Sequence, residues 1–221
     1  MDTLVNRERV HTAISQEKLL TIVTHRYMVD ERNYIDSVLE LYLNEIARPE
    51  LQNKLTYCIH ELAGNAKKAN TKRVYFREKG LDIYNSVEYH IGMRSFKEEM
   101  VQDIERYVHM QEEAGLYVKF QFKRDGQTLK IAVRNNTELT NEEKQRIKQK
   151  IVLARNASDL PEILEQSEDY TEGAGLGLVM SIMMLRNLGI STDNFQVLSK
   201  NGETYAVLYL NIPAQPIKKS S

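Results

Sequence analysis

The chain has 221 residues, of which 42% are hydrophobic and 28% are charged, a balance typical of a globular domain. Its 30 basic and 31 acidic residues give a net charge of -1, which is not the basic footprint of a nucleic-acid-binding protein. A single cysteine, Cys58, excludes an intrachain disulfide and suits a reducing compartment. There is no secretory signal pattern and no apolar run of roughly 18 residues, so we expect a soluble cytoplasmic protein that binds neither nucleic acid nor a membrane.

Residues 1–48 are predicted to form an N-terminal extension. Residues 18–28 are rich in β-branched side chains and are compatible with either a strand or a short helix. From Asp30, the expected N-cap, apolar residues recur at helical steps up to Pro49, which predicts an amphipathic helix over residues 30–48. Its apolar stripe consists of Ile35, Val38, Leu39, Tyr42, Leu43 and Ile46.

A second helix is predicted over residues 50–70, followed by a strand at residues 73–77 (RVYFR). Residues 80–94 are ambiguous. Ser95 and Glu98 match a capping box, which predicts a helix that ends before Gly115. This helix belongs to a helical insertion at about residues 85–115. Together with the helix over residues 30–48, it is a candidate surface for a homodimer or for a partner protein.

Two hairpins are predicted in the second half of the chain, around Asp125-Gly126 and around Asn201-Gly202. Between them we expect a helix from a capping box at Thr140 and Glu143 to about Arg155, a polar loop over 156–172, and an apolar helix over 176–188. This order predicts an α+β two-layer sandwich, with a mostly antiparallel (mixed) sheet covered on one face by helices. The main domain spans residues 49–213, and residues 214–221 form a loose tail.

The second helix carries a polar stripe whose residue types suit the binding of a metal ion and a phosphate. Glu61, Asn65 and Lys68 lie at steps of four and three residues, which places them on one face. An Asn carbonyl oxygen is a hard ligand suited to Mg²⁺, which binds through few protein groups together with waters and substrate phosphates. The Glu61 carboxylate can hold or deprotonate such a water, and Lys68 can reach a phosphate. The alternative is an ordinary solvated helix face.

Three glycines, Gly173, Gly175 and Gly177, lead directly into the helix predicted over 176–188. Glycine allows the backbone to approach an anion closely, and a helix N-terminus offers unpaired N–H groups. This arrangement predicts a phosphate cradle, whereas the alternative is a tight loop that only allows the helix to pack.

The pattern H-E-L-x-x-N-A-x-K at 60–68, followed about a hundred residues later by G-x-G-L-G-L at 173–178, resembles the N box and second glycine box of the GHKL ATPase superfamily. The chain looks closest to the histidine-kinase branch, which the last hairpin, G-x-T-Y-x-V-x-Y-L-x-I-P, also resembles. The resemblance covers about residues 51–213 and implies a Bergerat-type domain that binds ATP and Mg²⁺.

The resemblance also implies roles for individual residues. Asn65 would coordinate Mg²⁺, Glu61 would position a water or act as the base, and Lys68 would contact phosphate. Thr204 would lie at the adenine. The triphosphate would be wrapped by Gly173, Gly175 and Gly177 with the N–H groups of Leu176 and Leu178, under a lid formed by residues 156–172.

The chain departs from the family pattern at the adenine-binding segment, D-x-G-x-G, where it has VRNNTEL. Asn135, or Asn136 with a one-residue slip, stands in place of the Asp, and Asn135 is the favoured alignment. Thr137 and Leu139 replace the glycines. An amide can still bond adenine, but the loss of a charge-assisted bond, about 1–2 kcal/mol, implies roughly tenfold weaker binding. Altered nucleotide preference, weak binding and no binding are all compatible with this change.

The sequence contains neither a phosphoacceptor box with a dimerising hairpin nor a phenylalanine box, and His60 is expected to be a helix residue beside the site. These absences argue against autophosphorylation on a histidine. The resemblance implies a signalling protein kinase that transfers a phosphoryl group to itself or to a partner, as in anti-sigma-factor serine kinases of the superfamily, or an ATP-dependent regulator. One alternative is a degenerate domain that acts through protein contacts. Another is a chaperone- or repair-type ATPase, which this chain length disfavours.

Overall fold

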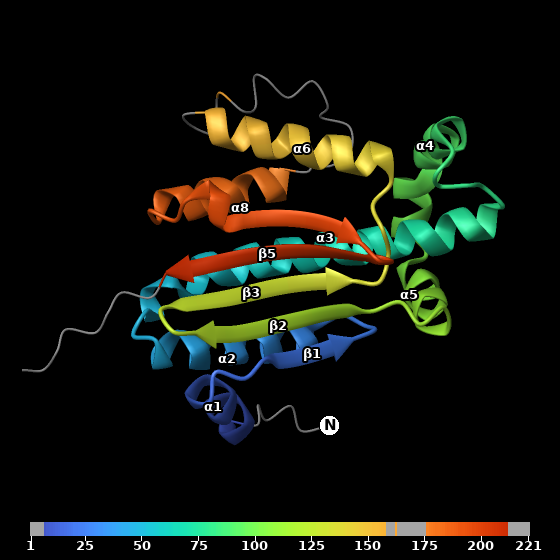
Figure 1. Cartoon of the computed structure of the whole chain (residues 1–221). Coiled ribbons are helices and arrows are strands. Elements are labelled where there is room, and N and C mark those ends of the chain that lie inside the picture. Colours follow the sequence, from blue (N-terminus) through green and yellow to red (C-terminus); the bar gives the residue numbers. More distant parts are fainter. Residues whose placement is uncertain (1–6, 158–161, 163–175, 212–221) are drawn as a thin grey trace, which may run out of the picture.

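The computed structural model of the chain describes residues 7–157, 162 and 176–211. The fold is α+β, with a five-stranded antiparallel sheet in the order β1-β2-β3-β5-β4. The strands are Leu20–Thr24 (β1), Val118–Asp125 (β2), Thr128–Asn135 (β3), Phe195–Lys200 (β4) and Glu203–Asn211 (β5). Helices cover one face of the sheet, and the other face is turned toward the viewer in Figure 1. The predicted α+β class is confirmed, and every strand pair is antiparallel.

The remaining elements of the described chain are helices. They are α1 (Arg7–Ser15), α2 (Val29–Glu45), η1 (Pro49–Leu51), α3 (Gln52–Lys79), α4 (Ser86–Gln102), α5 (Ile104–Glu113), α6 (Asn141–Asn156), α8 (Leu176–Asn187) and η2 (Thr192–Asn194). None of these helices combines the length and the apolar character needed to cross a membrane.

Helix α2 packs its predicted apolar stripe against the sheet, and all six residues of the stripe are buried. Tyr42, for example, is fully buried and stacks on Phe122 of β2 with ring centroids 5.3 Å apart. The prediction that Asp30 caps this helix is wrong. The N-cap is Met28, whose backbone N–H donates to the Glu31 carboxylate over 2.9 Å.

Helix α3 continues to Lys79, so the strand predicted at residues 73–77 is wrong. The helix contains no proline, runs on through Gly64, and ends at Gly80, which has a φ of 65°. Val74, Tyr75 and Phe76 are all buried, because α4 and α5 pack around this end of α3. Tertiary packing thus overrides the local β propensity of these residues.

The end of α3 forms a second core with α4 and α5, beyond the end of the sheet (Figure 1). Its buried members are Val74, Tyr75, Phe76, Ile83, Tyr89, Phe96, Tyr107 and Leu116. This helical appendage lies within the insertion that the sequence predicts at about residues 85–115.

The prediction that Ser95 caps a single helix to Gly115 is wrong in two respects. Helix α4 begins at Ser86, because the Asn85 side chain accepts the N–H groups of Val87 and Glu88. The chain then breaks at Asp103 between α4 and α5. Ser95 instead lies inside α4 and hydrogen-bonds the Tyr75 hydroxyl over 2.8 Å.

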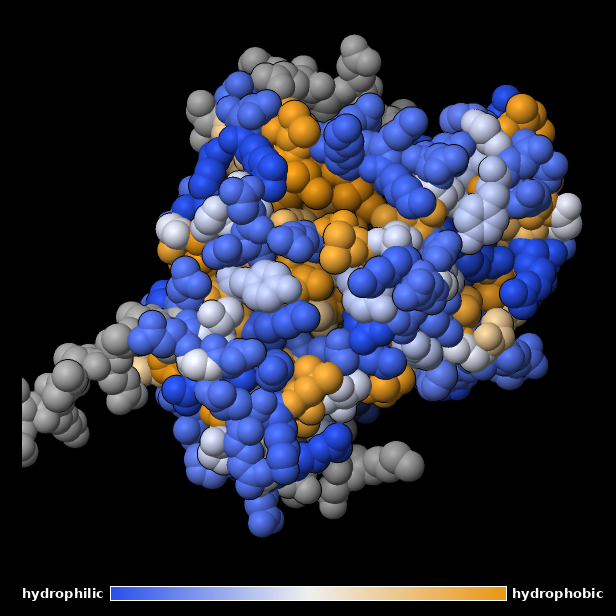
Figure 2. Space-filling view, viewed as in Figure 1, coloured by the Kyte–Doolittle hydropathy of each residue, from blue (hydrophilic) through white to orange (hydrophobic). Residues whose placement is uncertain are grey.

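Both predicted hairpins are confirmed, with Gly126 and Gly202 at positive φ in their turns. The Thr140 and Glu143 capping box is also confirmed at the start of α6. The sheet face not covered by helices is largely hydrophilic, with scattered apolar side chains (Figure 2). These elements place the end of β3, the start of α6 and the middle of α3 in one region.

Candidate functional site

Helix α3 supplies the polar stripe predicted from the sequence. Glu61, Asn65 and Lys68 all lie in this regular helix and therefore project from one face. The Asn65 and Lys68 side chains are exposed, whereas Glu61 is half-buried where α3 packs against α8. Two members of the stripe are thus free to meet a ligand, and the third lies between two helices.

The structure brings Glu61 directly against Gly177 in the first turn of α8. A Cβ added to Gly177 would overlap a carboxylate oxygen of Glu61 and lie only 2.5 Å from its carboxyl carbon. Glycine is therefore the residue that this close approach requires. The two helices are also joined at Cys58, whose thiol donates to the carbonyl of Ser181 over 3.7 Å.

The electrostatics of this contact restrict what can bind beside it. The N-terminus of α8 is a positive helix end, which stabilises the Glu61 carboxylate. A phosphate group at the same helix end would be repelled by Glu61 unless a cation lay between them. The Glu61 carboxylate and the Asn65 amide oxygen are hard donors of the kind that Mg²⁺ accepts.

Within the described residues no group of three His, Cys, Asp or Glu side chains could hold a metal ion. A magnesium ion at Glu61 and Asn65 would therefore depend on waters and phosphate oxygens for its remaining ligands, as is common for this ion. Gly173, Gly175 and nearly all of the predicted lid lie outside the described residues. Leu176 and Leu178 begin α8, where backbone N–H groups have no partner within the helix.

Asn135 is the last residue of β3, and its side chain is buried in a polar network against α3. It donates from Nδ2 to Asn70 Oδ1 over 3.1 Å and to Thr137 Oγ1 over 2.6 Å. Asn70 in turn donates to the carbonyl of Tyr117 over 3.1 Å. Because both hydrogens of the Asn135 amide are used, its Oδ1 is the atom left to accept a bond from a ligand.

Asn136 points elsewhere and binds the turn that precedes β2. Its Oδ1 accepts the N–H of Tyr117 over 2.8 Å, and its Nδ2 donates to the carbonyl of Gly115 over 3.0 Å. The geometry therefore agrees with Asn135, rather than Asn136, as the residue that faces the helical layer.

Thr204 lies opposite Asn135 in the β3–β5 pairing. Its hydroxyl donates to the carbonyl of Thr137 over 2.7 Å. Thr137 is itself buried, so a side chain fills the position where the family pattern has a glycine. Leu139 is half-buried, and its N–H donates to the Ser199 hydroxyl over 2.9 Å.

The sequence prediction missed Asn70, which is fully buried on α3. A signal existed, because Asn70 follows Ala66 by four residues and thus continues the apolar face of the helix. A buried Asn on an apolar stripe requires hydrogen-bond partners, and the end of β3 provides them.

A buried ion pair links α3 to the start of α6 beside this network. Arg73 donates to Glu143 over 3.0 and 2.7 Å, and Lys72 Nζ lies 3.4 Å from the same carboxylate. Burial opposes ionisation of Glu143, but Arg73 and Lys72 outweigh it and hold its pKa at about 2. The pair fixes the position of α6 relative to the end of β3.

His60 is held on both sides of its ring. Nδ1 is hydrogen-bonded to the Tyr27 hydroxyl, and Nε2 lies 3.0 Å from the Asp36 carboxylate. These contacts tie α3 to α2 and to the loop before it. His60 is therefore a structural residue in this arrangement.

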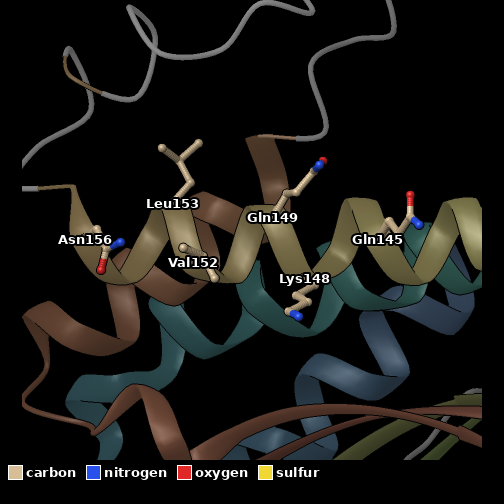
Figure 3. Close-up of a pocket in the computed structure, with 6 residues that line it drawn as sticks. All are labelled: Gln145, Lys148, Gln149, Val152, Leu153 and Asn156. Carbon is tan, nitrogen blue, oxygen red and sulfur yellow. The ribbon is translucent and has the colours of Figure 1, made fainter.

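A shallow hollow of about 490 Å³ runs along α6, and the described residues that line it all belong to that helix (Figure 3). They are Gln145, Lys148, Gln149, Val152, Leu153 and Asn156. None of them is a predicted site residue, so this hollow does not mark the site described above.

Comparison with known proteins finds a relative that matches most of the chain. The chain is 42% identical over 201 residues to an uncharacterized protein of Treponema pallidum (strain Nichols). The match covers 91% of this chain but 39% of the relative, so the chain spans well under half of that protein's length. No family model and no solved structure matches the chain.

Proposed function

We propose that this chain is a histidine-kinase-like domain of the GHKL superfamily that binds Mg-ATP and transfers a phosphoryl group to a partner signalling protein. The observation that carries the proposal is the contact between Glu61 and Gly177, which belong to two motifs far apart in the sequence. A cytoplasmic location accompanies this proposal. It is supported by the single cysteine, Cys58, which leaves the chain without an intrachain disulfide, as is usual in a reducing compartment.

At the phosphate end, each described residue has a role that suits its position. Asn65 is exposed and would offer its carbonyl oxygen to Mg²⁺, while Glu61 would position a water or accept the proton of the acceptor hydroxyl. Lys68 adds a positive charge one turn further along α3. The N–H groups of Leu176, Gly177 and Leu178 would donate to phosphate oxygens, and the resemblance assigns the same role to Gly173 and Gly175, which lie outside the described residues. Mg-ATP supplies the phosphoryl group, and these residues contribute positioning and charge neutralisation.

At the base end, Asn135 offers Oδ1 as an acceptor beside Thr204. This polarity suits the exocyclic amine of adenine, because the amide hydrogens are already used by Asn70 and Thr137. A 6-oxo purine would place an acceptor against an acceptor. We therefore expect ATP to bind more tightly than GTP.

A second candidate function is favoured by Thr137. Its buried side chain bonds both Asn135 and Asn70 and fills space at the base end. If that space is needed by the base, the chain would be a degenerate domain that acts through protein contacts without nucleotide.

Calorimetric titration with ATP, in the presence and absence of Mg²⁺, separates the two functions. We expect heat of binding that depends on Mg²⁺, and Asn65→Ala should abolish this Mg²⁺-dependent heat. Asn53→Ala is the matched control, because Asn53 is also exposed on α3 but lies outside the polar stripe. An absence of heat at millimolar ATP would exclude the proposed activity in favour of the second function. Labelled ATP, incubated with the protein alone and then with candidate partners, tests phosphoryl transfer.

A further inference from the structure

Helix α4 uses only one side to pack against the second core. Tyr89, Gly92 and Phe96 are buried on that side, with Gly92 directly against the Phe76 ring. The opposite side of α4 faces solvent at the outer edge of the appendage, and apolar surface is visible there in Figure 2.

Apolar side chains are concentrated on this outward side. Five of the eleven exposed large apolar side chains among the described residues fall in one short segment that contains α4: Tyr84, Val87, Ile91, Val101 and Ile104. Their exposed fractions run from 48% to 69%. An exposed apolar cluster of this kind marks an interaction surface more often than scattered exposed residues do.

The outward residues follow the spacing of a coiled-coil seam. Within α4, positions 87, 91, 94, 98 and 101 are separated by alternating steps of four and three, as the a and d positions of a heptad are. Tyr84 lies in the turn just before the helix. Arg94 and Glu98 occupy the two central positions, and both are exposed. Within one copy, Glu98 accepts a long hydrogen bond of 3.5 Å from the Gln102 amide.

We propose that this α4 seam, defined by Val87, Ile91, Arg94, Glu98 and Val101, pairs with the α4 seam of a second copy of the chain in antiparallel orientation. The opposite charges of Arg94 and Glu98 favour the antiparallel orientation. A parallel pair would place Arg94 against Arg94 and Glu98 against Glu98. In an antiparallel pair, Arg94 faces Glu98 of the second copy, and Glu98 faces Arg94.

The apolar positions fit the same register. When Arg94 is opposite Glu98, Ile91 falls opposite Val101, and Val87 falls near Ile104 at the junction of α4 and α5. Each contact then occurs twice about a two-fold axis, as an isologous interface requires. The seam is therefore complementary to itself, which is the reason to assign it to a second copy rather than to a different protein.

The size of the seam determines how tightly two copies are expected to bind. Helix α4 has 17 residues and is about 25 Å long, so one helix per copy gives an interface at the small end of specific complexes. In this pair Lys97 would lie near Lys97 of the second copy, at the edge of the interface. Its long side chain can extend into solvent there. We expect a concentration-dependent dimer.

Sedimentation analysis over a range of protein concentrations tests the proposal by charge reversal. Arg94→Glu and Glu98→Arg each place like charges together twice per dimer, and each should weaken dimerisation by about tenfold or more. The double variant restores opposite charges and should recover most of the wild-type affinity. Thermal melting of each variant checks that the fold is unchanged, since both side chains are exposed.

Several results would overturn the proposal. A wild-type protein that stays monomeric at several hundred micromolar has no such interface, and a dimer that both single variants leave intact forms through another surface. A double variant as weak as the single variants would exclude the antiparallel register. A mixture of Ile91→Cys and Val101→Cys proteins gives a direct readout, because antiparallel pairing joins the two different variants in one disulfide, whereas parallel pairing joins identical ones.

Discussion

Replacement of Gly177 by Ala tests the contact between α3 and α8 on which the candidate site depends. The new methyl group would overlap the Glu61 carboxylate, so this side chain must move away from the start of α8. Overpacking of this kind costs about 1–3 kcal/mol, while Ala in place of Gly in a helix contributes about 1 kcal/mol of stability. The net loss in the free energy of unfolding should therefore be about 0–2 kcal/mol.

Gly64→Ala is the matched control, since a Cβ added to Gly64 in α3 meets no atom within 4 Å. This variant should show only the helix-propensity gain of up to about 1 kcal/mol. The free energy of unfolding of the two variants, measured by urea denaturation, should differ by about 1–3 kcal/mol. In the Glu61→Ala background the methyl group has space, so the penalty of Gly177→Ala should largely disappear. Equal effects of Gly177→Ala and Gly64→Ala would refute the close approach of Glu61 to α8.

Three other predictions concern buried polar groups. Asn135→Asp removes the two hydrogens donated to Asn70 and Thr137, and should lower the free energy of unfolding by about 1–3 kcal/mol. The pKa of Glu143 is lowered from 4.5 to about 2, so its ionised form stabilises the fold above pH 4.5, and this contribution should fade as the pH falls toward 2. Glu143→Gln should therefore flatten the acid limb of a stability-pH curve. His60→Ala leaves a hydroxyl and a carboxylate without their partner and should destabilise by about 1–3 kcal/mol.

Urea denaturation measures the free energy of unfolding of all three variants. Each variant has a matched control substitution. Asn136→Asp loses a single bond in a half-buried position and should cost less than Asn135→Asp. Glu142→Gln, next to Glu143 but little buried, should leave more of the acid limb intact. For His60, substitution by Gln should retain part of the stability that Ala loses. Equal effects within any of these pairs would contradict the corresponding hydrogen-bond network.

Signals confined to a few neighbouring residues predicted much of the fold. The Thr140 and Glu143 capping box and the glycine turns at Gly126 and Gly202 are decided within three or four residues, and each forms as expected. The wrong predictions arise where contacts between residues far apart in the sequence determine the secondary structure. Residues 73–77 look like a strand by composition but are helical, because α4 and α5 bury this end of α3.

The candidate site was predictable in part for the same reason. Helical periodicity alone places Glu61, Asn65 and Lys68 on one face. Periodicity cannot bring Gly177 to Glu61, and that expectation came only from the resemblance between motifs. The network of Asn70 and Thr137 was not predictable, because it exists only where the end of β3 crosses α3.

The two ends of the site differ in a way that affects how any variant must be interpreted. Asn65 is exposed and makes no described hydrogen bond from its side chain, so its loss should change ligand binding without changing stability. Asn135 is buried in a closed network, so its loss changes stability even if no ligand ever binds. A binding defect at Asn135 is therefore informative only after correction for unfolded protein, whereas a defect at Asn65 bears directly on the ligand. The hypothesis of nucleotide binding therefore depends on Asn65, at the exposed phosphate end of the site. The preference for one base depends on Asn135, at the buried end.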